Sequence, residues 1–181
     1  SGAAGLRRHR SHDVVPIDWC RIASRGVTDA AVTARPWDAD AVDVTETSHG
    51  EVVVTVLPAQ EDRQRRIVER VEVLAQDLAL DARGFWQVHP GAPTVLVDTV
   101  LEMLDPQAGE SVLDLYAGVG LFARFLAERV GEGARVVAVE GNPGAVKMAA
   151  RNLAGLAKVR TSAGSVDAVL AAEYDEPFDL V

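Results

Sequence analysis

Two acidic residues and two glycines form the pattern in this chain that is best suited to chemistry. Asp114 lies within the apolar run 112–115, and Gly118 and Gly120 follow that run. Glu140 ends a second apolar run, twenty residues after Gly120. Glycine lets the backbone approach a ligand where a Cβ would clash, and a helix starting there would offer free N–H groups. An acid at the tip of the second strand can accept hydrogen bonds from two ribose hydroxyls. The pattern therefore predicts a site for a nucleoside-bearing cofactor.

The kind of cofactor follows from what this pattern lacks. A dinucleotide fingerprint has the spacing G-x-G-x-x-G and directs backbone N–H groups at a pyrophosphate. Here Ala123 stands at the third glycine position, and a carboxylate at Asp114 would repel a pyrophosphate but can accept a hydrogen bond from an ammonium group. S-adenosylmethionine carries an ammonium and a sulfonium but no phosphate, so the pattern, which resembles the class I methyltransferases, favours it over NAD. A plain βαβ crossover with a tight turn is the alternative.

The elements that must position these residues alternate between strand and helix patterns beyond residue 84. Such alternation predicts an α/β fold with a parallel, doubly wound sheet, of which this chain holds the N-terminal half. Asn142 followed by Pro143 is expected to cap and open a helix. The expected strands are 111–115, 135–139, 159–162 and 178–181, and the expected helices are 93–104, 121–130, 143–153 and 166–172.

The chain before residue 84 has a different pattern, in which short β-rich runs dominate. Strands are expected at 13–17, 41–47 and 51–57, with a hairpin turn at 48–50. The run 67–74 is compatible with a helix, but its β-branched residues favour a strand. We therefore expect a β-rich module over residues 1–83 and a cofactor-binding domain over residues 84–181.

Composition restricts the class of protein and its partners. The 181 residues are 48% hydrophobic, no apolar stretch reaches the length of a membrane span and no signal peptide is visible, so a cytoplasmic protein is expected. The net charge of −9 is unevenly distributed, because residues 1–37 hold six arginines against three aspartates. This basic segment can contact the phosphates of a nucleic acid, or it is a solvated face.

Two further segments narrow the resemblance. Residues 84–92 read G-F-W-Q-V-H-P-G-A, and residues 5–20 read G-L-R-R-H-R-S-H-D-V-V-P-I-D-W-C. Together with the D-L-Y-A-G-V-G turn, they resemble the RNA uracil-5-methyltransferase family, which makes 5-methyluridine in tRNA and ribosomal RNA. The resemblance implies S-adenosylmethionine as the cofactor, RNA as the partner, and a β-rich central module before the class I domain.

The resemblance also implies roles for individual residues. Gln87 matches a glutamine near the methyl-donor end of the cofactor, Tyr116 matches the aromatic residue of the turn, and Glu140 matches the ribose-binding acid. Ser165 stands where many class I enzymes have an adenine-contacting aspartate, and Leu121 stands where some relatives have asparagine. Without the family, Gln87 would be a loop-capping amide and Tyr116 a core aromatic. The expected cofactor-binding residues are Gln87, Asp114, Tyr116, Gly118, Gly120, Leu121, Glu140 and Ser165.

The chemistry of the family determines what is expected to be missing. A cysteine thiolate adds to carbon 6 of uracil, carbon 5 attacks the sulfonium methyl group, and a base then removes the proton from carbon 5. In the family these two groups follow a D-P-P-R-like motif, which lies beyond a strand like 178–181. We therefore expect a fragment without a catalytic nucleophile or base. A methyltransferase for another substrate, or a cofactor-binding or RNA-binding module without catalysis, is the alternative.

Cys20 is the single cysteine of the chain and lies far before the cofactor turn. In relatives, a cysteine in this context is the last ligand of a 4Fe–4S cluster, whose other three ligands precede it. Those three are absent here, and one thiolate cannot hold such a cluster. Cys20 is therefore either a cluster ligand in the longer protein or a buried free thiol. The four histidines show no metal-ligand spacing with it.

Overall fold

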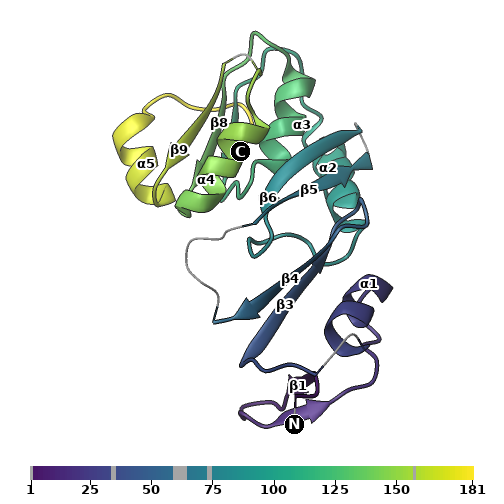
Figure 1. Ribbon diagram of the computed structural model, residues 1–181. Helices are drawn as coiled ribbons and strands as arrows, with labels where there is room; N and C mark the ends of the chain where they lie inside the picture. The colour runs from purple at the N-terminus through teal and green to yellow at the C-terminus, as the bar shows by residue number, and fades with distance from the viewer. Residues whose placement is uncertain (1, 34–35, 59–64, 73–74, 157) are drawn as a thin grey trace. The chain divides into compact units, whose positions relative to one another are not determined.

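The computed structural model describes residues 2–33, 36–58, 65–72, 75–156 and 158–181. The chain forms two compact units, Ser1–Arg65 and Arg66–Val181 (Figure 1). Within the described residues, no helix has the length and apolar character needed to cross a membrane.

The first unit consists of two β-hairpins and a short helical segment. Strands β1 (Gly5–Arg7) and β2 (Val14–Pro16) pair antiparallel, as do β3 (Ala41–Glu46) and β4 (Val52–Leu57). The Gly50 N–H donates to the Thr47 carbonyl over 2.8 Å and closes the second hairpin, as expected for the turn at 48–50. Between the hairpins lie α1 (Arg25–Thr28) and a π-helical segment (Asp29–Thr33), which the sequence patterns did not indicate.

The second unit begins with an antiparallel hairpin and continues as alternating strands and helices. Its elements are β5 (Arg66–Val71), β6 (Gln76–Asp81), α2 (Ala92–Leu104), β7 (Val112–Leu115), α3 (Leu121–Val130), β8 (Val136–Glu140), α4 (Pro143–Asn152), β9 (Val159–Ala163) and α5 (Val166–Glu173). Strands β7, β8 and β9 form a parallel sheet in that order. The α/β class is thus confirmed, and the elements predicted between residues 93 and 172 agree with the structure to within a residue or two. The strand expected at 67–74 is present as β5, and residues 73 and 74 lie outside the described residues.

The strand expected at 178–181 is present as a single parallel bridge between Leu180 and Val112. The Leu113 N–H donates to the Leu180 carbonyl over 2.9 Å, and the Leu180 N–H donates to the Ser111 carbonyl over 3.0 Å. Because β8 occupies the other edge of β7, this segment adds a fourth position to the sheet. The strand order is therefore the segment at Leu180, β7, β8 and β9. The chain first adds strands on one side of β7 and then returns to add the last one on its other side. Open α/β sheets bind ligands at such a switch point, at the carboxyl ends of the strands.

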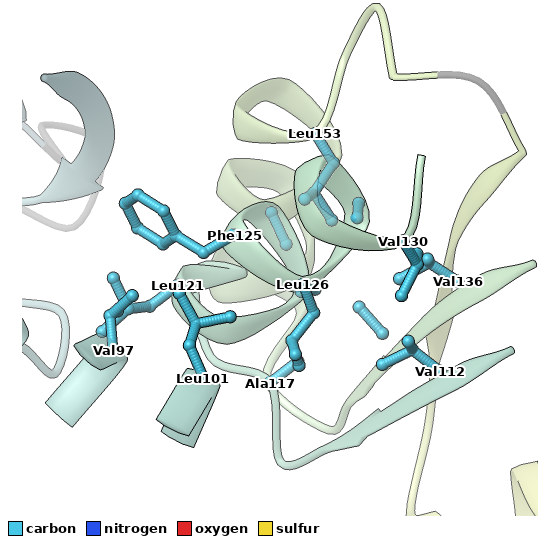
Figure 2. Packing of buried hydrophobic residues seen from close by; sticks show 14 of the residues in the cluster. Val97, Leu101, Val112, Ala117, Leu121, Phe125, Leu126, Val130, Val136 and Leu153 are labelled. Atoms are coloured by element: carbon cyan, nitrogen blue, oxygen red, sulfur yellow. The ribbon is translucent and has the colours of Figure 1, made fainter. Parts of the chain in front are cut away.

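The core lies on both faces of β8. Val136 and Ala138 belong to one buried cluster, whereas Val137 and Val139 belong to another, because successive side chains of a strand point to opposite faces. The first cluster is filled by apolar residues of α2, α3 and α4, and Phe125 of α3 is 1% exposed (Figure 2). A strand buried on both faces reads as a continuous apolar run, which explains why the sequence predicted it well.

The hairpin β5–β6 changes the expected division of the chain. Its residues Val71 and Leu78 belong to the same buried cluster as Val112 and Phe125. The compact units divide between residues 65 and 66, whereas the sequence pattern changes near residue 84. The sequence did not reveal this boundary, because strand β6 was not expected and the packing partners of the hairpin are distant in sequence.

Candidate cofactor site

The expected site residues gather at the carboxyl ends of the parallel strands. Tyr116, Gly118 and Gly120 form the turn between β7 and α3, and Glu140 is the last residue of β8. Glu140 pairs in register with Ala163 of β9, and the Gly164 N–H donates to the Glu140 carbonyl over 3.0 Å. The three strand ends therefore meet at one edge of the sheet.

The two glycines of the turn meet different requirements. Both have positive φ angles, 56° at Gly118 and 84° at Gly120. A Cβ on Gly120 would lie 3.3 Å from Leu153 and 3.5 Å from Ala149, so this glycine allows the turn to pack on α4. A Cβ on Gly118 would meet nothing within 4 Å. Gly118 therefore lies on the open side of the turn, where a ligand can approach the backbone.

Tyr116 is 78% exposed, so it is not a core aromatic residue. Its φ of 59° lies in the left-handed region, which is unfavourable for a side chain of this size. Such strained positions cluster at ligand-binding sites, where the surrounding structure enforces them. The ring is thus exposed on a backbone position whose conformation the surrounding turn enforces.

The carboxylate of Glu140 is fixed by two backbone N–H groups. The Gly118 N–H donates to Oε2 over 2.8 Å, and the Asn142 N–H donates to Oε1 over 2.7 Å. Each carboxylate oxygen can accept a further hydrogen bond, since an ionised carboxyl group has about four lone-pair sites. The side chain is therefore oriented in advance, with two remaining acceptor positions for hydroxyl groups.

Asp114 caps the N-terminus of α3, a role that its position in the sequence did not suggest. Its Oδ2 accepts the Ala123 N–H over 2.9 Å and thereby caps α3, whose N-cap residue Gly120 has no side chain to do so. Asp114 is 9% exposed. Burial raises its pKa to about 6; the Ala123 N–H opposes this effect, and the charge of Glu140 adds to it. Among the described residues, only Oδ2 has a hydrogen-bond partner, so Oδ1 can accept from a cation.

The side chain of Leu121 packs in the core and is 8% exposed (Figure 2), so a cofactor contact from this residue stays a prediction for its backbone. Only its backbone N–H, at the first turn of α3, can face a ligand. Ser165 is exposed at the N-cap of α5 and makes no capping hydrogen bond, so its hydroxyl is available.

Gln87 lies in the segment between β6 and α2 and is half-buried. Its amide makes no hydrogen bond with the described residues, so it does not cap a loop there. Trp86 beside it packs against the core, whereas Phe85 and Val88 are exposed. The packing of Trp86 anchors the segment, and Gln87 remains the expected site residue that the structure does not join to the others.

Cys20 lies in the first unit as a half-buried free thiol. In the part of the chain that the structure describes, no group of three or more His, Cys, Asp or Glu side chains comes together to hold a metal ion. The assignment of Cys20 stays a prediction about the longer protein.

One residue near the turn was missed by the sequence patterns altogether. Asn152, at the end of α4, is 8% exposed and donates to the Val119 carbonyl within the turn over 2.8 Å. An asparagine at a helix end is usually assigned to capping, and no local signal distinguishes one that reaches a distant turn.

Comparison with known proteins agrees with this geometry. Residues 112–181 match a family model described as a methyltransferase domain. An uncharacterized RNA methyltransferase from Streptomyces coelicolor is 37% identical over 207 aligned residues, covering 99% of this chain and 45% of that protein. The 23S rRNA (uracil(1939)-C(5))-methyltransferase RlmD from Pseudomonas fluorescens is 42% identical over 54% of this chain and 21% of its own length. Among solved structures, Pyrococcus horikoshii TYW2 in complex with MeSAdo aligns at a TM-score of 0.45 and 19% identity, covering 62% of this chain and 39% of that one.

The parallel sheet, the glycine turn with its two acids, and the match over 112–181 define a class I methyltransferase domain, the class that uses S-adenosylmethionine. Over nearly its whole length the chain is similar to two Streptomyces proteins named as uncharacterized RNA methyltransferases. The chain spans about half of the two Streptomyces relatives, 45% of each.

Proposed function

We propose that the second unit binds S-adenosylmethionine and that the protein to which this chain belongs methylates carbon 5 of uridine in RNA. The observation that carries the first part is the Glu140 carboxylate, held by Gly118 and Asn142 beside the open side of the turn. The uracil specificity is supported by the relatives named for that activity and by the residue pattern around Gln87.

The bound cofactor would lie across the carboxyl edge of the parallel sheet. Glu140 accepts the two ribose hydroxyls, and the open oxygen of Asp114 accepts the ammonium group. Ser165 contacts the adenine edge from the end of β9. Gln87 contacts the cofactor near the methyl group, which the cofactor supplies as an electrophile. Tyr116 covers the exposed side of the turn.

The first unit is proposed to contact RNA. Arg7, Arg8 and Arg10 are exposed around the turn of the hairpin β1–β2, and such side chains can neutralise phosphates. The substrate is tRNA or ribosomal RNA, and a cytoplasmic location follows from such a substrate. Of the β-rich module expected over residues 1–83, we therefore propose the part in the first unit as the RNA-contacting region.

We further propose that this 181-residue stretch alone does not methylate RNA. Placing a methyl donor beside uracil does not activate carbon 5, because the covalent adduct with a thiolate does so. By the family pattern, the nucleophile and the base follow the segment that contains Leu180. S-adenosylmethionine with a tritiated methyl group, incubated with unmodified tRNA and ribosomal RNA, should label RNA only with the full-length protein. Label transferred by this chain alone would overturn the assignment.

Calorimetric titration tests the cofactor site directly. S-adenosylmethionine should bind and NAD should not. Glu140→Ala should lose at least one charge-assisted hydrogen bond, worth about 1.5–3 kcal/mol. Glu102→Ala, which removes an exposed acid from α2, is the matched control and should bind as the unsubstituted chain does. Equal affinity of Glu140→Ala and the unsubstituted chain would remove Glu140 from the site.

A further inference from the structure

The carboxamide of Asn152 joins two segments that are far apart in the sequence. Its Nδ2 donates to the Val119 carbonyl over 2.8 Å and to the Ala79 carbonyl over 3.0 Å. Its Oδ1 accepts the Ala79 N–H over 2.8 Å. Both donors and the acceptor of this buried amide are therefore in use, as a buried polar group requires.

The contact with Ala79 completes an otherwise open strand edge. Strand β6 pairs with β5 on one side, where Ala79 lies opposite Val68. On the other side, Asn152 accepts from the N–H and donates to the C=O of Ala79, as a neighbouring strand would do at a single residue. Arg124 reinforces the contact by donating to the Asn152 carbonyl over 3.0 Å and to Gln76 Oε1 over 3.2 Å. The hairpin is thus attached to the methyltransferase domain through polar contacts as well as apolar packing.

The contact with Val119 reaches the centre of the cofactor turn. Val119 stands between the two positive-φ glycines, and the peptide that follows it is held at both ends. Its carbonyl accepts from Asn152, and the Gly120 N–H donates to the Ala117 carbonyl over 2.8 Å. Loss of these bonds would loosen the turn, which also contains Gly118, whose N–H donates to the Glu140 carboxylate.

We propose that Asn152 is a positioning residue that sets the cofactor turn and makes its shape depend on the docked hairpin β5–β6. This proposal rests on the assignment of the turn to S-adenosylmethionine. Asn152 acts from the core side through Val119, whereas the open side of the turn is at Gly118. Its effect on the cofactor is therefore transmitted by the backbone.

Amide hydrogen exchange of the cofactor-free chain, measured by NMR, tests without any ligand whether Asn152 holds the turn. Asn152→Ala should accelerate exchange at Gly118 and Gly120 by about tenfold more than at other amides of the domain, because local opening of the turn becomes easier. Val97→Ala is the control, because it removes packing from the same buried cluster but leaves the hydrogen bonds of the turn in place. Equal acceleration at the turn in both variants would mean that Asn152 contributes only general stability, and would overturn the proposal.

A second variant weakens the contact of Asn152 with Ala79 and leaves its contact with Val119 in place. It also covers the case in which Asn152→Ala does not fold. Ala79→Pro removes the N–H that donates to Asn152 but no hydrogen bond to β5, since that N–H points away from β5. It should also accelerate exchange at Gly118 and Gly120 selectively. Unchanged exchange at the turn would overturn the dependence on the hairpin.

Titration with S-adenosylmethionine completes the test. Asn152→Ala should weaken binding by about tenfold, as expected when support behind a site is removed, and Val97→Ala should not. Unchanged affinity in an Asn152→Ala chain with a loosened turn would overturn the positioning role. If the unsubstituted chain does not bind the cofactor at all, the proposed function fails. The exchange data still show in that case whether Asn152 holds the turn.

Discussion

The two units of the chain differ in how much apolar surface they bury. In the described part of the first unit, Val53 of β4 is the only apolar residue that is fully buried, at 2% exposure. In its described residues, the second unit has a buried cluster on each face of its parallel sheet. Burial of apolar area is the main favourable contribution to folding, so the second unit should be the stable part of the chain. A stable scaffold of this kind can support the strained backbone of a binding turn, whereas paired hairpins with little core cannot.

The largest expected effect comes from the core of the second unit. Phe125→Ala removes an aromatic ring that is 1% exposed and should destabilise this unit by about 3–5 kcal/mol. Val53→Ala removes two buried carbon atoms from the first unit and should cost about 1–2 kcal/mol. Hydrogen exchange measured separately on peptides of each unit checks this contrast. Equal losses would show that the two units do not differ in the packing of their cores.

The buried carboxylate of Asp114 should make the stability of the second unit depend on pH. Burial raises its pKa from 3.8 to about 6. Between these values the folded chain binds a proton that the unfolded chain does not, so this contribution to stability rises as the pH falls through 6. It is lost as the pH rises, by about 3 kcal/mol at most. Asp114→Asn keeps an acceptor for Ala123 and should remove the dependence.

Urea unfolding from pH 4 to pH 8 measures this effect as the difference between Asp114→Asn and the unsubstituted chain. Asp179 provides a control of opposite sign once the series is extended below pH 4, because its pKa is lowered from an ordinary value of 3.8. Hydrogen bonds from the backbone N–H and hydroxyl of Ser111 hold the pKa of Asp179 below its usual value. Its contribution is therefore present above that value and is lost as the pH falls. A difference for Asp114→Asn that is constant across the range would contradict the burial argument.

A smaller effect on stability is expected from Tyr116, which lies in the turn and not in the buried core. Glycine adopts the left-handed region without strain, so Tyr116→Gly should raise the stability of the second unit by about 0.5–1 kcal/mol. The same change removes an exposed ring from the site and should weaken binding of S-adenosylmethionine. Thermal unfolding and calorimetry of one preparation measure both quantities. A loss of stability would show that the ring contributes packing that its 78% exposure does not suggest.

The smallest effect on stability is expected in the basic hairpin of the first unit. Replacing Arg7, Arg8 and Arg10 with glutamine should change the free energy of unfolding by less than about 0.5 kcal/mol, because all three are exposed. Affinity for RNA should nevertheless fall, and the salt dependence of binding should lose about one unit of slope for each lost phosphate contact. An unchanged slope would assign RNA binding to another surface.

Local chemistry in the sequence was sufficient to predict much of the second unit. Asn142 caps α4 as expected, with its Oδ1 accepting the Gly144 and Ala145 N–H groups over 2.9 and 3.1 Å. The buried strand β8 and the glycine turn were recognisable because apolar runs, caps and glycines act within a few residues of one another. The same local signals placed Glu140 at the end of its strand.

The tertiary structure decided the features that depend on distant partners. Ala79 and Asn152 are 73 positions apart, yet their hydrogen bonds attach the hairpin β5–β6 to the cofactor domain. The burial of Leu121 and the capping role of Asp114 likewise depend on which face of α3 meets the sheet. A side chain's partners are set by packing between elements, and a residue's type and its near neighbours carry no record of that packing. The sequence therefore determined the elements and the outline of the candidate site, whereas the three-dimensional packing determined which side chains near the turn are exposed and which are buried.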